Sequence, residues 1–372
     1  MSRRARPAGR VITAAILAVL VVTTAAAALV SVLEDAGDPA RPGLAVGLVA
    51  NALGGGVAEL DEVRRLDVRW VREEVRWAEV EPTRGRRTWA RTDRIFAAAA
   101  QRGIRVLPLV LETPSWAGRQ RLGLPRDPTA FARFAALVAA RYGPGGRFWQ
   151  LRSRLDDGLA PRRIELWNEP YLEFFSRGGT DPQRYAQMVA ASVEAVRGAN
   201  PDVQVLMAAE TTYDRPDGTV GDWTADVLAA RPDLAGSVGG VAVHPYTPRS
   251  PTATGGPRRT RFTRMDEILA TLRRHGATTP RLWITEIGWT TCEEGPDCVS
   301  ESRQVQYTKQ ALDVVSTRYR DIVEGVFFYH LRDFAPAGRG TSQQHYGLLR
   351  ADGSQKPAAR AVRRAARAAA AG

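Results

Sequence analysis

The chain has 372 residues and a formal net charge of +12, and 44% of its residues are hydrophobic. Its length suits one large folded domain, and no long stretch has the composition of a disordered segment. Nearly all of the positive charge is arginine, because Lys309 and Lys356 are the only lysines. No nucleic-acid motif accompanies this charge. We interpret it as a solvated surface or an attraction to acidic polysaccharide, and we expect no nucleic-acid partner.

The N-terminus predicts export from the cytoplasm. Four arginines in the first ten residues precede an almost uncharged apolar run at residues 11–33, which is typical of an export signal. The run exceeds the usual signal core of about 7–15 residues and approaches the roughly 20 that span a bilayer, so a cleaved signal and a membrane anchor both stay open. We assign residues 1–37 to this segment and 38–372 to one domain. The protein is expected to be extracytoplasmic, either secreted or anchored.

The two cysteines of the chain agree with export. Cys292 and Cys298 flank Glu-Glu-Gly-Pro-Asp in a predicted loop. A disulfide there would close a small loop, as is common in exported proteins, and two free thiols are the alternative. Two cysteines without a nearby histidine cannot complete a zinc shell, so no metal site is expected.

Apolar runs alternate with amphipathic stretches along residues 38–372. The runs predict strands at 44–50, 67–72, 104–111, 163–168, 203–209, 239–245, 281–286 and 323–330. The stretches between and after them predict helices at 57–65, 89–102, 128–142, 182–198, 221–231, 262–275, 301–319 and 355–370. Thr88, Asp127 and Asp181 are candidate N-caps.

This alternation predicts a parallel sheet, and eight strand–helix units predict a closed (β/α)8 barrel. A doubly wound open sheet is the alternative. It is less favoured because no glycine-rich phosphate loop follows the first strand, where three consecutive glycines at 54–56 are a weak signal.

Polar residues at the strand ends predict the functional site, since barrel chemistry lies at the carboxyl ends of the strands. Glu169 follows the fourth strand in Leu-Trp-Asn-Glu-Pro, and Glu286 ends the seventh in Trp-Ile-Thr-Glu-Ile-Gly-Trp. Arg72 ends the second predicted strand, and His244-Pro245-Tyr246 follows the sixth. Both glutamates are therefore expected on one face of the sheet.

Two carboxyls in this arrangement are typical of a retaining glycosidase. One protonates the leaving oxygen while the other attacks the anomeric carbon, and different environments keep one protonated and the other ionised. Each motif alone is also compatible with a structural role, because Asn-Glu-Pro is a common helix start and a strand-end Glu is often a solvated charge. Their combination within a barrel pattern favours catalysis.

These motifs resemble clan A retaining glycoside hydrolases, whose acid/base follows an Asn at the end of strand four and whose nucleophile ends strand seven. The resemblance covers most of residues 43–365 and includes His244-Pro245-Tyr246 and Tyr346-Gly347-Leu348. Within the clan, the sequence is most similar to glycoside hydrolase family 39 and related bacterial exopolysaccharide hydrolases. Family 5-like endoglycanases are the competing assignment.

The resemblance implies a role for each matching residue. Glu169 would be the general acid/base, Glu286 the nucleophile, and Asn168 would hold the 2-hydroxyl of the sugar. The substrate would be a polysaccharide or oligosaccharide, and no cofactor is implied.

It also implies supporting contacts around the nucleophile. Arg72 and Tyr246 would hydrogen-bond the nucleophilic carboxylate, and His244 would shape the same wall. Trp289 and Tyr329 are candidate sugar-packing aromatics, although most aromatics near strand ends serve the core.

The eighth strand departs from the clan pattern, because Tyr329-His330 replaces a Trp often found there. The identity of the sugar therefore stays open. A non-catalytic sugar-binding barrel and a transglycosylase remain alternatives to a hydrolase, and a monomer is expected.

Overall fold

The computed structural model describes residues 40–50 and 56–371. The predicted signal or anchor at residues 1–37, with its apolar run at 11–33, lies outside these residues. Within the described ranges, no helix combines the length and apolarity needed to cross a membrane.

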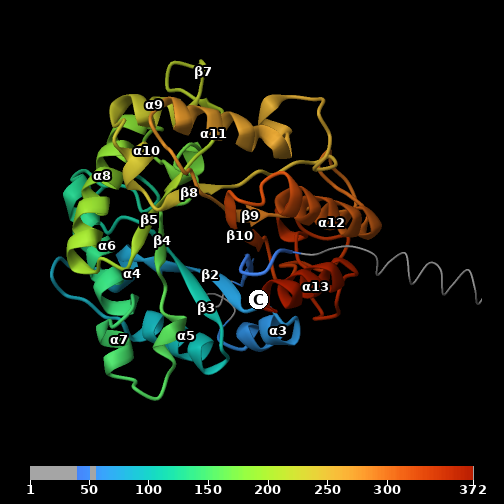
Figure 1. Cartoon of the computed structure of the whole chain (residues 1–372), viewed down its shortest axis with the longest axis horizontal. Coiled ribbons are helices and arrows are strands. Elements are labelled where there is room, and N and C mark those ends of the chain that lie inside the picture. The colour runs from blue at the N-terminus through green and yellow to red at the C-terminus, as the bar shows by residue number, and fades with distance from the viewer. Residues whose placement is uncertain (1–39, 51–55, 372) are drawn as a thin grey trace, which may run out of the picture. The chain divides into compact units, whose positions relative to one another are not determined.

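Eight parallel strands close into a barrel at the centre of the domain (Figure 1). They are β1 (Ala45–Val49), β2 (Trp70–Arg76), β3 (Arg105–Leu111), β4 (Arg163–Leu166), β5 (Gln204–Ala208), β8 (Gly240–Val243), β9 (Leu282–Ile287) and β10 (Val323–Phe328). Pairing of β1 with both β2 and β10 closes the sheet. The predicted (β/α)8 barrel is therefore confirmed, and the open-sheet alternative is wrong.

A main helix follows each barrel strand and covers the outside of the barrel (Figure 1). These helices are α3 (Glu59–Arg65), α5 (Ala90–Gln101), α6 (Pro128–Tyr142), α8 (Pro182–Ala199), α9 (Trp223–Ala230), α11 (Met265–Arg274), α12 (Glu301–Thr317) and α13 (Ala358–Ala370). All eight predicted helices are present.

Shorter elements lie in the connections. They are the helices α4 (Trp77–Val80), α7 (Arg147–Gln150) and α10 (Leu234–Ser237), the hairpin of β6 (Tyr213–Asp214) and β7 (Val220–Gly221), and 3-10 turns at Asp157–Leu159, Glu173–Phe175, Arg258–Thr260, Phe262–Arg264 and Ser342–Gln344.

Side-chain caps fix the starts of two long helices. Asp127 accepts a hydrogen bond from the backbone N–H of Thr129 at the start of α6, and Asp181 accepts one from that of Arg184 at the start of α8. Proline begins both helices, where its missing N–H costs nothing. The predicted Thr88 cap is wrong, because α5 begins one residue later and its N-cap residue, Trp89, makes no side-chain cap.

An apolar layer fills the barrel below its carboxyl ends. It is formed by Ala45, Leu107, Leu206, Ala242, Trp283 and Phe327, all buried. Two glycines make room for its two large rings, because a Cβ on Gly47 would lie 2.4 Å from Phe327 and one on Gly325 would lie 2.5 Å from Trp283. Since side chains alternate along a strand, Thr285 points inward one layer above Trp283.

We predict that Asp127→Ala lowers the free energy of unfolding by about 1 kcal/mol, because the first turn of α6 loses its side-chain acceptor. Thr88→Ala is the matched control and should change it by much less, since Thr88 contributes only its backbone N–H, to the carbonyl of Val80. Urea unfolding of both variants checks this. Equal losses would contradict the cap assignment.

Candidate active site

The backbone after β4 takes an uncommon conformation that presents Glu169. Strand β4 ends at Leu166, earlier than predicted, and both Trp167 (φ 66°) and Glu169 (φ 38°) lie in the left-handed region that non-glycine residues seldom adopt. Trp167 is buried, and its indole N–H donates to the carbonyl of Phe175 at 2.6 Å. This anchoring holds the turn, so the following carboxylate projects from the strand end.

Arg72 is the centre of the polar layer inside the barrel. Its guanidinium donates twice to Glu165, at 2.6 and 2.9 Å, once to Glu286 at 2.6 Å and once to Asn168 at 2.7 Å. Burial opposes the charge of Arg72, but Glu165 and Glu286 more than offset it and raise its pKa. The predicted contact with Glu286 is present. The predicted position at a strand end is wrong, because β2 continues to Arg76.

His244 connects the two predicted catalytic carboxylates. Its Nδ1 lies 2.9 Å from Oε1 of Glu169 and 3.7 Å from Oε2 of Glu286. The two glutamate oxygens are therefore no farther apart than these two distances combined. On the other side of the ring, Nε2 lies 3.0 Å from the hydroxyl of Thr285. Burial works against charging His244, yet Glu286 and Glu169 raise its pKa above the usual value.

Tyrosines form the remaining wall around Glu286. The Tyr246 hydroxyl donates to Oε2 of Glu286 at 2.9 Å, as the sequence predicted. Tyr329 and Tyr346 pack edge-on against Tyr246 and against each other. Burial, together with the charge of Glu286, raises the pKa of both Tyr246 and Tyr329. These hydroxyls therefore stay protonated and can donate hydrogen bonds at neutral pH.

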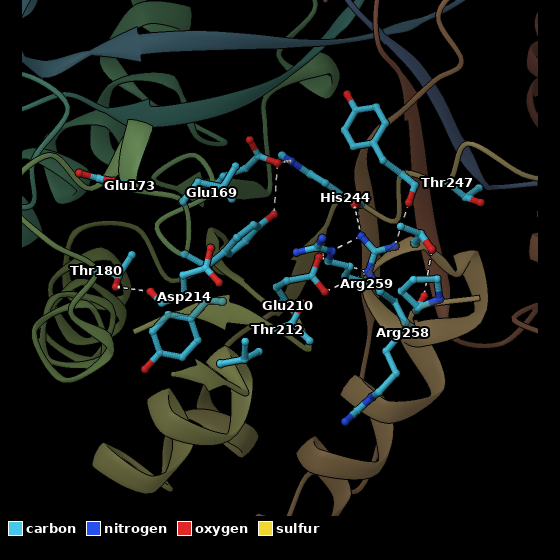
Figure 2. Close-up of a pocket in the computed structure, with 18 of the residues that line it drawn as sticks. Glu169, Glu173, Thr180, Glu210, Thr212, Asp214, His244, Thr247, Arg258 and Arg259 are labelled. Carbon is cyan, nitrogen blue, oxygen red and sulfur yellow. Dashed lines mark hydrogen bonds and ion pairs between the residues drawn. The ribbon is translucent and has the colours of Figure 1, made fainter. Parts of the chain in front are cut away.

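Two cavities meet at Glu169. The first, about 900 Å³, is lined by Glu169 and His244 and extends to the hairpin β6–β7 and the loop that contains Arg258 and Arg259. Figure 2 shows Glu169 directed toward His244 in this cavity. The second, about 780 Å³, is lined by Glu169, Glu286 and their neighbours Arg72, Asn168, Tyr329 and His330. Glu169 lies at the boundary and lines both.

The predicted disulfide is present, whereas the predicted sugar-packing Trp289 is buried. Cys292 and Cys298 form a disulfide, with Cα atoms 5.1 Å apart, as expected. Trp289 borders the first cavity, but it is 2% exposed and packs against Tyr307, so little of its ring can reach a sugar. Its role as a sugar platform stays a prediction.

Sequence reasoning missed two inward-facing residues, Glu165 and Thr285. Glu165 is 1% exposed and accepts hydrogen bonds from Arg72 and from the Thr285 hydroxyl, the latter at 3.1 Å. The available signal was a carboxylate inside an otherwise apolar strand, because a buried charge requires a partner. Thr285 carried no comparable signal.

Within the described ranges, no three His, Cys, Asp or Glu side chains gather in a way that could hold a metal ion.

No protein-family model and no curated protein matches the sequence. Solved structures match its fold. A family 39 glycoside hydrolase from the gut symbiont Bacteroides cellulosilyticus WH2 is 20% identical with a TM-score of 0.62, covering 90% of this chain and 65% of that protein. The family 39 enzyme of Xanthomonas axonopodis pv. citri is 18% identical with a TM-score of 0.60, covering 89% and 67%. A family 5 protein (GH5_18) from Bifidobacterium longum subsp. infantis is 18% identical with a TM-score of 0.58, covering 87% and 78%.

The chain thus spans about two thirds of the length of the two family 39 structures. At these identities the likeness establishes the fold alone. That fold is the one the resemblance to clan A glycoside hydrolases implies, and the similar structures include both families that the sequence left in competition.

His330 provides a pH-dependent test of this site. Burial, with the nearby Lys356, lowers its pKa to about 3. In the unfolded chain, histidine has a pKa of about 6.5. Above that pH, the depressed pKa costs the folded protein nothing. As pH falls toward 3, the unfolded chain binds more protons than the folded protein, and the folded protein loses stability. Phenylalanine at this position retains a ring to stack on Phe334. We predict that, between pH 7 and pH 5, the free energy of unfolding of His330→Phe falls by about 2 kcal/mol less than that of wild type.

Urea unfolding of both proteins at the two pH values measures this difference. The raised pKa of His244 acts with the opposite sign, but it is common to both proteins and cancels in the comparison. An identical pH dependence in the two proteins would contradict the buried neutral histidine.

Proposed function

We propose that the protein is a retaining glycoside hydrolase that cleaves O-glycosidic bonds of a polysaccharide or oligosaccharide by double displacement. Glu169 is the general acid/base and Glu286 the nucleophile. One observation carries the proposal: the buried carboxylate of Glu286 and the partly buried carboxylate of Glu169 converge on His244, the first held by a cation and the second by a histidine.

The different environments of the two glutamates support these roles. Glu286 accepts hydrogen bonds from the Arg72 guanidinium and the Tyr246 hydroxyl, which favour an ionised nucleophile. Among the residues that the structure describes, no guanidinium contacts Glu169, and its neighbours at hydrogen-bond distance are His244 and Tyr171. Two carboxyls in unlike surroundings are what separate acid and nucleophile roles require.

The spacing favours retention over inversion. Carboxyls of inverting enzymes are about 6.5–9.5 Å apart, whereas those of retaining enzymes are about 5–5.5 Å apart. Nδ1 of His244 lies 2.9 Å from Oε1 of Glu169 and 3.7 Å from Oε2 of Glu286. The separation of these two oxygens therefore cannot exceed the sum of the two distances, which is at the lower edge of the inverting range.

In the first step, Oε of Glu286 attacks the anomeric carbon while the leaving oxygen takes the proton of Glu169. In the second step, water attacks that carbon, its proton passes to Glu169, and the bond to Glu286 breaks. Asn168, whose Oδ1 accepts a hydrogen bond from Arg72, would hold the 2-hydroxyl of the sugar next to Glu286. A transglycosylase would use the same first step and another sugar in place of water.

We assign the two cavities to the two sides of the glycosidic bond. The cavity that contains Asn168 and Glu286 takes the glycone, and the cavity beyond Glu169 takes the leaving group, because the acid faces the leaving oxygen. A leaving-group cavity of about 900 Å³ suits further sugar units better than a small alcohol.

Charge in the glycone cavity favours an uncharged sugar. Four acidic side chains line it, those of Glu73, Glu74, Glu169 and Glu286; Glu74 pairs with Arg76, and Glu169 carries the proton in this proposal. The one arginine among its lining residues, Arg72, already donates to three protein side chains. A uronate in this cavity would meet like charge without a free cation, so this side of the substrate is better suited to a neutral sugar than to an acidic one.

We also propose that the protein acts outside the cytoplasm as a monomer. The disulfide between Cys292 and Cys298 supports export, since such bonds persist in oxidising compartments.

Glu286→Ala should abolish turnover without unfolding the protein, because Arg72 keeps its two bonds to Glu165. The turnover rate of Glu169→Ala should be about 10²–10⁴-fold below that of wild type for substrates with poor leaving groups. The loss should be much smaller for substrates that release acidic phenols, because these leave without a proton. The assay is release of reducing ends or phenol from a panel of neutral and acidic polysaccharides and aryl glycosides, with stereochemistry followed by NMR.

Glu112→Gln is the matched control. Glu112 is also a buried strand-end glutamate with positive φ, but it lines neither cavity and pairs with Arg121. Its turnover should stay within about twofold of wild type, as expected for a group outside the site. Undiminished activity in Glu286→Ala would overturn the mechanism, and a folded but inactive wild type would favour a sugar-binding barrel.

Aryl xyloside, glucoside and glucuronide test the glycone charge, because they differ only at C5. We predict that kcat/KM for the better neutral sugar exceeds that for the glucuronide by at least about tenfold, as one like charge nearby costs about 1–4 kcal/mol. Glu74→Gln should reduce the ratio between these two kcat/KM values. A glucuronide preferred by wild type would contradict this substrate class.

A further inference from the structure

The hydrogens around Thr285 can be counted. Its hydroxyl lies 3.1 Å from Oε1 of Glu165 and 3.0 Å from Nε2 of His244. A threonine hydroxyl has one hydrogen to donate and can accept two. Only one of the two neighbours can therefore receive the hydrogen of Thr285, and the other must donate.

Glu165 is the neighbour that receives it. Both oxygens of this carboxylate already accept from the Arg72 guanidinium, at 2.6 and 2.9 Å, and an ionised carboxylate has no hydrogen to give. Thr285 therefore donates to Glu165, and its oxygen accepts from His244. Nε2 of His244 must carry a hydrogen.

The opposite ring nitrogen faces Glu169. A neutral imidazole has one N–H, so with Nε2 protonated its Nδ1 is an acceptor. At 2.9 Å, the contact with Oε1 of Glu169 then requires one proton between them, either on the carboxyl or as a second proton on the ring. A neutral histidine with its hydrogen on Nδ1, which would donate to an ionised Glu169, is excluded.

We propose that Glu165 and Thr285 are positioning residues that fix the tautomer of His244, and thereby keep within the Glu169–His244 pair the proton that the leaving oxygen needs. The inference rests on the proposed function. Neither residue touches the reacting atoms. Glu165 on β4 acts through Thr285 on β9, and Thr285 acts through His244, just after β8, on Glu169 in the turn after β4.

The same arrangement serves the second step. Once Glu169 has given up its proton, its carboxylate faces the bare lone pair of a neutral His244, and both oxygen and nitrogen are then acceptors. That repulsion is relieved when Glu169 takes the proton of the attacking water. The chain therefore favours return of the proton to the pair in every cycle.

The charged and titratable groups that face this pair come from the surrounding strands. They are Arg72 on β2, Glu165 on β4, Glu286 on β9, the hydroxyls of Tyr171, Tyr246 and Tyr329, and the ion pair of Glu210 with Arg264, whose Nη2 donates to the carbonyl of His244. Thr285 exchanges hydrogen bonds with both His244 and Glu165, so removing its hydroxyl alters the tautomer without adding or removing a charge.

Thr285→Val and Thr285→Ser in the full chain form the test. Valine has the shape of threonine but no hydroxyl, so His244 can place its neutral hydrogen on Nδ1 and stabilise the ionised form of Glu169. We expect the alkaline limb of kcat/KM to move down by about one pH unit, because a hydrogen bond to a charged group is worth about that much. Thr285→Ser should retain the wild-type limb.

The choice of leaving group separates this effect from simple loss of packing. With a poor leaving group, the kcat/KM of Thr285→Val should fall about tenfold below that of wild type at pH values above the wild-type alkaline limb, as a shift of one pH unit implies. With an acidic phenol it should remain near wild type in the first step. An unshifted alkaline limb, or an equal loss with both leaving groups, would overturn the proposal.

Ring-nitrogen NMR of His244, assigned by comparison with His244→Gln, tests the tautomer without any substrate. Wild type and Thr285→Ser should carry hydrogen on Nε2, and Thr285→Val should gain the Nδ1–H form. A wild-type Nδ1–H tautomer would contradict the proposal even if the protein is a glycosidase. The expected tautomer in an inactive protein would instead point to failure of the proposed function.

Discussion

The site depends on one buried cation. Arg72 is 4% exposed and donates to Glu165, Glu286 and Asn168, which come from different strands or strand ends. Removing it would leave Glu165 and Glu286 as buried carboxylates without a counter-charge, a change that typically costs about 3–5 kcal/mol. The same guanidinium thus balances the charge of Glu286, orients the amide of Asn168, and makes Glu165 the acceptor for the Thr285 hydroxyl.

The apolar layer below Arg72 increases the effect of these contacts. Trp283 and Phe327 fill the barrel beneath the polar groups, and Gly47 and Gly325 are the positions that give them room. Water is thereby excluded from one side of the network, and electrostatic interactions are stronger where the local dielectric is low. A side chain at either glycine would displace a ring and disturb the floor of the site.

The sequence predicted the barrel and both glutamates because their signals are local. Apolar runs, helix periodicity and the Asp127 and Asp181 caps depend on neighbours along the chain. Thr285 could not be found that way, because its partner Glu165 is 120 positions away and the two meet only when the barrel closes. The misplaced end of β2 has a similar origin: Glu73, Glu74 and Arg76 look like loop residues until their partners are known.

The two cavities show how one barrel can separate two tasks. Glu286 and Asn168 line only the second cavity, proposed for the glycone, His244 lines only the first, proposed for the leaving group, and Glu169 lines both. Sugar identity can therefore change through the wall of Tyr329 and His330, where this chain departs from the clan pattern, without disturbing the proton at Glu169. If Glu165 and Thr285 control that proton from inside the strands, as proposed, the loops that line the cavities can vary while the acid stays fixed.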